Sequence, residues 1–302
     1  MMESKLIKDG LKVMGLVFLF SLLSIYIGLY SPIMGFFINL VLPIPIAYIV
    51  SKYNNQSSLI IIITVALTNG LLLGMTGGMQ LGAMMIVNTV VGFGLIGFVV
   101  GSGVKEGFSP RITLILTVAA VIFSTVITNQ VIPYLTGTGY KDVINDIVNI
   151  INQNSQFGEF SETVKQIVPL IIRIYPSILI ITSIITGIVV YYISTWYLKK
   201  KGLVDKIYKP VKMWYFPRIL SLGIVIALLL DGNIFFVNLL IVLLFFMFLQ
   251  GFSVGLFYTS RLKNPIINFL YIMAIVFLNF LLLPVLIILG LFDMWFNLRK
   301  FK

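Results

Sequence analysis

Long apolar runs recur along almost the whole chain. Runs of about 17–25 apolar residues have the length that a helix needs to cross roughly 30 Å of hydrocarbon. They do not alternate between polar and apolar residues as transmembrane β-strands do. We therefore expect an all-α, polytopic transmembrane helix bundle of about eight or nine spans. The expected spans cover approximately residues 12–30, 32–51, 57–75, 79–101, 111–135, 168–198, 215–230, 233–258 and 265–292.

The composition agrees with a membrane protein and excludes several kinds of chemistry. Charged residues make up 10% of the 302 residues, against about 25% in soluble domains. The chain has no cysteine and no histidine, which removes disulfides, thiol nucleophiles, Cys/His metal sites and imidazole acid–base chemistry. We expect no metal, no cofactor and no enzymatic activity, because nearly all of the ten carboxylates lie in loops.

Lysine and arginine lie mainly between the expected spans, which indicates membrane topology and not nucleic-acid binding as the reason for the net charge of +11. Cytoplasmic loops are rich in these residues. The distribution predicts a multi-pass protein with a cytoplasmic N-terminus, and the family resemblance given below implies the bacterial plasma membrane. Nine full spans would place the C-terminus outside. Eight spans, or a last span that is kinked or doubled back near Pro284, would keep it inside.

Prolines and glycines interrupt several spans. Pro43 and Pro45 predict a bent or partly unwound second span, which is tolerated where protein or a wet cavity satisfies the freed carbonyls. Gly77 and Gly78 favour a short turn between the third and fourth spans. Small residues four apart let membrane helices approach closely. We expect this helix-packing role for Gly74, Gly78, Gly82, Gly97 and Gly101.

Polar side chains inside the apolar spans are the candidate binding residues. Each amide either forms a hydrogen bond between helices or contacts a ligand. Arg173 and Asp231 are expected near the external side, where they either form an ion pair or contact a charged solute. The full set is Asn69, Gln80, Asn88, Asn129, Gln130, Arg173, Asp231, Asn238, Gln250 and Asn279.

Two segments outside the spans have alternative interpretations. Residues 136–167 place apolar side chains at helical spacing, which predicts an amphipathic helix. It is expected either to lie on the external surface or to form a lid over an outward-facing cavity. The basic loop 199–214 is either an ordinary cytoplasmic anchor or a docking site, and it would also attract anionic lipid.

Four short stretches resemble the YybS-like family of bacterial membrane proteins. They are "LPIPIAYIV", "MWYFPRIL", "FLQGFSVGLFY" and "LGLFDMWFNLRK", and the resemblance extends over essentially the whole chain. The family usually has an acidic residue where Asn297 stands. The motif residues are Trp214, Phe216, Pro217, Arg218, Gln250, Gly251, Asp293, Trp295 and Arg299.

That family is in turn remotely similar to the substrate-binding S-components of energy-coupling-factor (ECF) transporters. This similarity implies a six-helix module over residues 1–198, followed by the loop 199–214 and a C-terminal hairpin with a kinked last helix over 215–302. It also implies binding of a small solute on the external side and docking to ATP-driven coupling subunits in trans. Docking in that group uses small residues on the first helix, where this chain has Gly10 and Gly15.

Two functions follow from these observations. The first is small-solute binding or transport in the lipid bilayer, with ATP bound by a partner because the chain lacks a GxxxxGK[ST] stretch. The alternative is a non-transporting scaffold or regulatory partner of another membrane complex. Proton-driven transport is disfavoured, because it would use carboxylates within the spans. The sequence predicts neither the substrate nor the oligomeric state.

Overall fold

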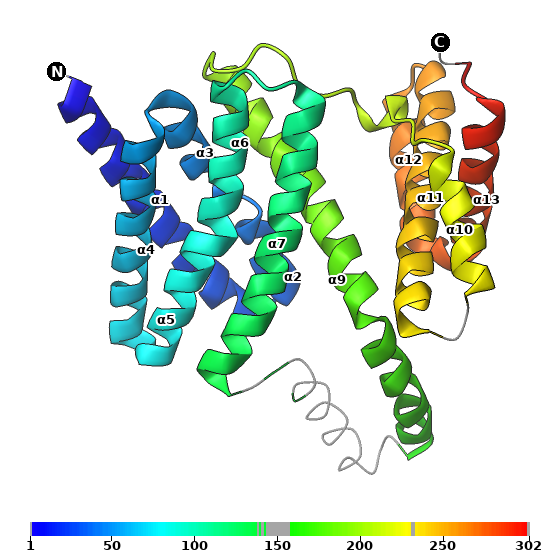
Figure 1. The fold of residues 1–302 in the computed structure, drawn as a ribbon, viewed down its shortest axis with the longest axis horizontal. Helices are drawn as coiled ribbons and strands as arrows, with labels where there is room; N and C mark the ends of the chain where they lie inside the picture. Colours follow the sequence, from blue (N-terminus) through cyan, green and yellow to red (C-terminus); the bar gives the residue numbers. More distant parts are fainter. Residues whose placement is uncertain (1, 138, 140–141, 143–157, 231–232, 301–302) are drawn as a thin grey trace. The chain divides into compact units, whose positions relative to one another are not determined.

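A computed structural model describes residues 2–137, 139, 142, 158–230 and 233–300. These residues are helical or irregular, and none of them lies in a β-strand. The chain divides into two compact units (Figure 1), which we describe separately. Unit 1 comprises Met1–Val168 and Thr182–Tyr208, and unit 2 comprises Pro169–Ile181 and Lys209–Lys302. Asp231 and most of the expected amphipathic segment 136–167 lie outside the described residues.

Unit 1 contains the N-terminal helices, which run side by side in Figure 1. The last of them, α9, is shared, because its residues 169–181 belong to unit 2. The fourth expected span contains a stretch of π-helix, η1, that the sequence analysis did not predict. The elements are α1 (Met2–Tyr30), α2 (Pro32–Asn39), α3 (Pro43–Lys52), α4 (Asn55–Gly77), α5 (Met79–Val87), η1 (Asn88–Gly94), α6 (Leu95–Lys105), α7 (Pro110–Thr136) and α9 (Gly158–Lys200).

The break expected in the second span is confirmed, since α2 ends at Asn39 and α3 begins at Pro43. Helix α3 lies at the centre of unit 1, where most of its side chains are buried. Two glycines bring α6 against it. A Cβ atom on Gly97 would stand 2.6 Å from the carbonyl oxygen of Pro43, and one on Gly101 would stand 2.6 Å from that of Ala47.

Helices α4 and α5 form a hairpin through glycine contacts. A Cβ atom on Gly82 would lie 2.7 Å from the carbonyl oxygen of Gly70 and 3.0 Å from the Cα atom of Gly74. The helix-packing role expected for Gly78 is wrong. It ends α4 with a φ of 90° and has open space where a Cβ atom would stand. A left-handed backbone of this kind favours glycine, so the residue serves the turn.

Unit 2 is built around one long helix, α11, which packs against α13. Helix α10 has 11 residues, about 16 Å of length at 1.5 Å per residue. The full span expected over residues 215–230 is therefore wrong, since a crossing needs about 20 residues. The elements of unit 2 outside α9 are η3 (Val211–Met213), α10 (Ile219–Leu229), α11 (Ile234–Arg261), α12 (Pro265–Phe277) and α13 (Asn279–Phe296).

The last expected span doubles back on itself. Helices α12 and α13 meet at an angle of 114°, and the break lies at Leu278 instead of Pro284, which is inside α13. The end of α13 returns to the end of α11, where the Tyr258 hydroxyl donates a hydrogen bond to the carbonyl oxygen of Leu298 at 2.9 Å. The folded-back alternative is thus the one that the structure adopts.

The lengths and outer faces of the helices fit a lipid environment. In the described part of the chain, seven helices are long and apolar enough to cross a membrane, or eight if the bent pair counts as one span. Large apolar side chains such as Leu71, Leu229 and Phe280 are exposed on the outside, as contact with acyl chains requires. The chain is a multi-pass α-helical membrane protein.

Candidate functional site

A small cluster of uncharged polar side chains is buried inside unit 1. Asn69 of α4 donates from Nδ2 to the hydroxyl oxygens of Ser21 on α1 and Thr89 on η1, at 3.1 and 3.0 Å. All three residues are at most 2% exposed. We call these three residues the Asn69 cluster. Asn69 is 48 residues from Ser21 and 20 residues from Thr89 in sequence, so the cluster joins three separate helices.

The Asn69 amide has one end without a hydrogen-bond partner in the described part of the protein. Its Oδ1 atom is buried and unpaired. Exchanging the amide oxygen and nitrogen would let both hydroxyls donate to Oδ1, and would leave Nδ2 unpaired instead. An unpaired buried polar group costs about 1–3 kcal/mol. The free end of this amide therefore favours a water molecule or a bound solute as its partner.

The position of the Asn69 cluster follows from the local backbone. Asn69 lies 8 residues from the last residue of α4 and 14 from the first, or about 12 and 21 Å at 1.5 Å per residue. The cluster is therefore closer to the turn that contains Gly78. Thr89 sits in the π-helical stretch, and such stretches occur frequently at functional sites.

A second polar contact extends this arrangement along α1. Ser24, one turn after Ser21, donates to Asn39 Oδ1 of α2 at 2.7 Å. The same hydroxyl lies 3.2 Å from the carbonyl oxygen of Gly35. Unit 1 thus places hydroxyls and amides, and no carboxylate or cation, at this depth among its described residues.

Unit 2 contains a buried cluster that is charged. The carboxylate of Asp293 and the guanidinium of Arg299 form an ion pair at 2.8 Å, with both side chains 0% exposed. Gln250 Nε2 of α11 donates to Asp293 Oδ2, and Gln250 Oε1 accepts from the backbone N–H of Phe216 at 3.0 Å. Together with Ser253, these residues form what we call the Asp293 cluster.

Arg299 uses all five of its N–H donors in the Asp293 cluster. Two reach Asp293, one reaches Ser253 Oγ at 2.6 Å, and the others reach the carbonyl oxygens of Lys212 and Trp214 at 2.9 and 2.6 Å. Ser253 in turn donates to the carbonyl oxygen of Val211. The cluster therefore joins the 211–216 segment, α11 and the C-terminal segment.

The other motif residues surround this cluster. Arg218 Nε and the Tyr215 hydroxyl both donate to the carbonyl oxygen of Met294, at 3.0 and 2.9 Å. Trp295 Nε1 donates to Ser221 Oγ at 3.0 Å. Asn297 ends α13 with a φ of 48°, a conformation that asparagine adopts more readily than most residues.

The remaining motif residues near the Asp293 cluster come from the segment before α10 and from α11. The Phe216 ring lies between those of Trp214 and Phe246, and Pro217 precedes the first turn of α10. A Cβ atom on Gly251 would overlap the carbonyl oxygen of Leu286, so α11 and α13 touch backbone to backbone there. The three C-terminal motifs are therefore one structural unit.

The remaining predicted residues lie apart from both clusters. Asn238 bridges α9, because it accepts from the backbone N–H of Ser177 at 2.8 Å and donates to the carbonyl oxygen of Arg173 at 2.9 Å. Asn129 donates to the carbonyl oxygen of Thr125 in its own helix. Gln80, Gln130 and the Arg173 side chain are exposed, Asn88 is half-buried, and the Asn279 side chain and Asp231 lie outside the described residues.

Sequence reasoning missed several members of the two clusters. Ser21, Thr89 and Ser253 are short hydroxyl residues inside apolar helices, where such side chains commonly bond to their own backbone. Gly290 packs against the carbonyl oxygen of Met247 in α11. A small residue in an apolar helix is the sequence feature that could have pointed to a packing role for Gly290. Many glycines in this chain share that feature, and only the position of the partner helix shows which of them make such a contact.

The chain was compared with known protein families. Residues 18–294 match the family described as "Predicted membrane protein (DUF2232)". The chain belongs to this family. The matched region contains the whole Asn69 cluster, and Asp293, Gln250 and Ser253 of the other cluster, while Arg299 lies just beyond it. No curated protein and no solved structure gave a significant match.

Proposed function

We propose that this DUF2232 protein binds a small polar solute inside unit 1, as an S-component of an ECF transporter does. The observation that carries the proposal is the buried amide of Asn69, whose free end has no partner in the described residues. The surrounding hydroxyls of Ser21 and Thr89 offer further donors and acceptors. An uncharged site of this kind suits a neutral or zwitterionic solute better than an ion, because no charged side chain of the described residues bonds to it.

The arrangement of the spans supports the same proposal. Six of the seven candidate spans end at or before Lys200, and six is the number that the resemblance to S-components implies. With the N-terminus in the cytoplasm of a bacterial cell, the Asn69 cluster lies closer to the external side of the plasma membrane. The solute would then enter from outside, and ATP-driven coupling subunits in trans would supply the energy.

A thermal-shift screen of the purified protein against vitamins, nucleosides and amino acids tests this proposal. A ligand present at 100 times its Kd stabilises the folded state by about 2.7 kcal/mol. We expect one class of solute to raise the unfolding temperature, and Asn69→Leu to abolish that rise. Without ligand, Asn69→Leu is expected to change the free energy of unfolding by less than about 1 kcal/mol, because the lost hydrogen bonds are offset by removing an unpaired group.

The matched control is Gln80→Leu, which removes an exposed amide near the end of the same hairpin. It should leave the ligand-induced rise unchanged. Absence of any rise across the whole screen would contradict the proposal. If the ligand still raises the unfolding temperature of Asn69→Leu, the solute binds at a site other than the Asn69 cluster.

A non-transporting scaffold is the second candidate function. The Asp293 cluster favours it, because three of the four motif stretches serve to hold unit 2 together and none of the residues in that cluster is exposed. In that case unit 2 would present a rigid surface to another membrane protein. Deleting the external segment 136–167 separates the two functions, since solute transport should fail and scaffold activity should persist.

A further inference from the structure

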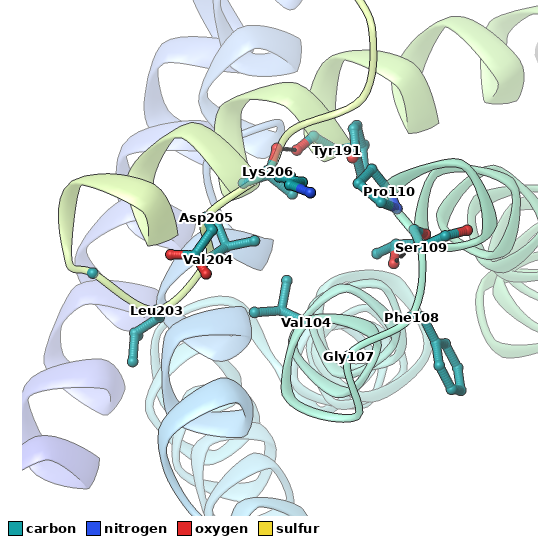
Figure 2. Close-up of a pocket in the computed structure, with 13 residues that line it drawn as sticks. Val104, Gly107, Phe108, Ser109, Pro110, Tyr191, Leu203, Val204, Asp205 and Lys206 are labelled. Carbon is teal, nitrogen blue, oxygen red and sulfur yellow. Dashed lines mark hydrogen bonds between the residues drawn. The ribbon is translucent and has the colours of Figure 1, made fainter.

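A cavity of about 370 Å³ opens in unit 1 between the turn at residues 107–110 and the segment at residues 202–206. Figure 2 shows its walls, which are the turn between α6 and α7, the last turns of α9 and the segment after α9. Val104 and Ser109 come from the first wall, Tyr191 from α9, and Lys206 from the following segment. None of these residues belongs to the Asn69 cluster.

The floor of the cavity carries hydroxyl groups. Thr113, Tyr191 and Thr195 line it and are at most 3% exposed. Tyr191 Oη accepts a hydrogen bond from the backbone N–H of Tyr208 at 3.1 Å, so its own proton remains available to an acceptor in the cavity. A buried donor with this freedom favours a ligand rich in acceptor oxygens.

The rim of the cavity carries a lysine and backbone donors that bond to no carbonyl among the described residues. Lys206 lines the opening and is exposed. The backbone N–H groups of residues 204–206 donate to no carbonyl within the described residues. Residues 104–111 and 199–206 contain six lysines or arginines and two carboxylates, Glu106 and Asp205. Asp205 also lines the cavity, so its lining holds one cation and one carboxylate, and the excess of positive charge comes from basic residues that flank the lining residues in sequence.

Aromatic side chains place the cavity at the level of a membrane surface. Trp196 is 53% exposed, and the Lys200 Nζ atom lies 3.8 Å from the centre of its ring. Phe108 at the cavity is 47% exposed. Tryptophan and lysine at the ends of membrane helices mark the lipid–water interface. A headgroup of a neighbouring lipid can therefore reach the opening.

We propose that this cavity binds a phosphate group, carried either by an anionic phospholipid or by a small soluble phosphomonoester. Lys206 supplies the charge, the Tyr191 hydroxyl donates from the floor, and the free N–H groups of residues 204–206 donate from the side. The volume accommodates a phosphate with a glycerol-sized substituent. This site shares no residue with the Asn69 cluster of the proposed solute site.

Two experiments on the full-length protein distinguish a lipid from a soluble compound as the source of the phosphate group. In one arm, native mass spectrometry compares the retention of phosphatidylglycerol and phosphatidylcholine. In the other, thermal shifts are measured with inorganic phosphate and glycerol 3-phosphate. We expect Lys206→Gln to weaken binding of the phosphate compound roughly tenfold, as the loss of one charge-assisted hydrogen bond implies. Tyr191→Phe should weaken it less and keep the ring in place.

The matched control is Lys8→Gln, which removes an exposed positive charge of unit 1 that does not line the cavity. Retention of phosphatidylglycerol alone would support the proposal with a lipid as the source. Competition by glycerol 3-phosphate would support it with a soluble source. Equal retention of both lipids together with no thermal shift, or equal losses in Lys206→Gln and Lys8→Gln, would overturn it. Unfolding of each variant without ligand shows whether Tyr191→Phe acts through stability alone.

Discussion

The two units bury polar groups of different charge, and both leave buried oxygens without a hydrogen-bond partner in the described residues, among them Asn69 Oδ1 and Asp293 Oδ1. Unit 1 places uncharged amides and hydroxyls in its interior and leaves one end of the Asn69 amide unpaired. Among its described residues, the ion pair between Asp9 and Lys52 is partly exposed, with side chains 17% and 37% accessible. Unit 2 buries its Asp293–Arg299 pair completely and pairs every donor of the guanidinium.

This difference in charge distinguishes the proposed solute site from a buried ion pair with a structural role. A buried ion pair with all donors paired has no capacity left for a ligand on the arginine side, and removing one partner leaves an uncompensated charge. An uncharged amide with a free end can exchange its partner at small cost. The uncharged cluster of unit 1 is therefore the one that suits the proposed solute site, and the ion pair of unit 2 is the one that suits a structural role. Beside the ion pair of unit 1, burial and the hydrogen bond that the Tyr53 hydroxyl donates to Asp9 raise the pKa of Tyr53 above its ordinary value.

Breaking the Asp293 cluster gives the largest expected effect. Arg299→Met should lower the free energy of unfolding of the protein by about 3–5 kcal/mol, because it leaves the Asp293 carboxylate buried without a cation. The double variant Asp293→Leu with Arg299→Met should be more stable than the single one. Urea or thermal unfolding in detergent measures both.

The control for that experiment is Arg261→Met, which removes an exposed arginine of unit 2. It should change stability by less than about 1 kcal/mol. If Arg299→Met and Arg261→Met lower the free energy of unfolding equally, the structural role of the buried ion pair in unit 2 is contradicted.

Overfilling the contact between α11 and α13 in unit 2 gives the next largest loss of stability. In Gly251→Ala the new methyl group would overlap the Leu286 carbonyl, and we expect a loss of about 1–3 kcal/mol from overpacking. Gly223→Ala is the matched control, because its Cβ would meet only the end of the flexible Leu243 side chain, 3.0 Å away. Equal unfolding temperatures of the two variants would contradict the close contact of α11 and α13.

Removing the exposed ion pair of unit 1 gives the smallest effect. Lys52→Gln should lower stability by at most about 1 kcal/mol, and high salt should reduce the difference because exposed charges are screened. Chemical unfolding at low and high ionic strength measures this. A loss as large as that of Arg299→Met would remove the distinction between the two pairs.

Much of the helical architecture could be predicted, because it depends on local properties of the chain. Proline and asparagine act on their own neighbourhood, so the break before Pro43 and the capping of α4 by Asn54 follow from nearby residues. The glycine turn at Gly78 has the same origin. The π-helical stretch and the shortness of α10 were missed, since the local apolar pattern there is the same as in an ordinary span.

The apolar runs by themselves determined that this protein is a multi-pass helical membrane protein, because their length must match the thickness of the hydrocarbon. Only the tertiary structure decided which polar residues meet inside the protein. Asn69 meets Ser21 across 48 residues, and Gln250 meets Asp293 across 43. Amides of the same type stand exposed at Gln80 and Gln130. Whether a buried polar group is paired depends on helices distant in sequence, and no local pattern carries that information.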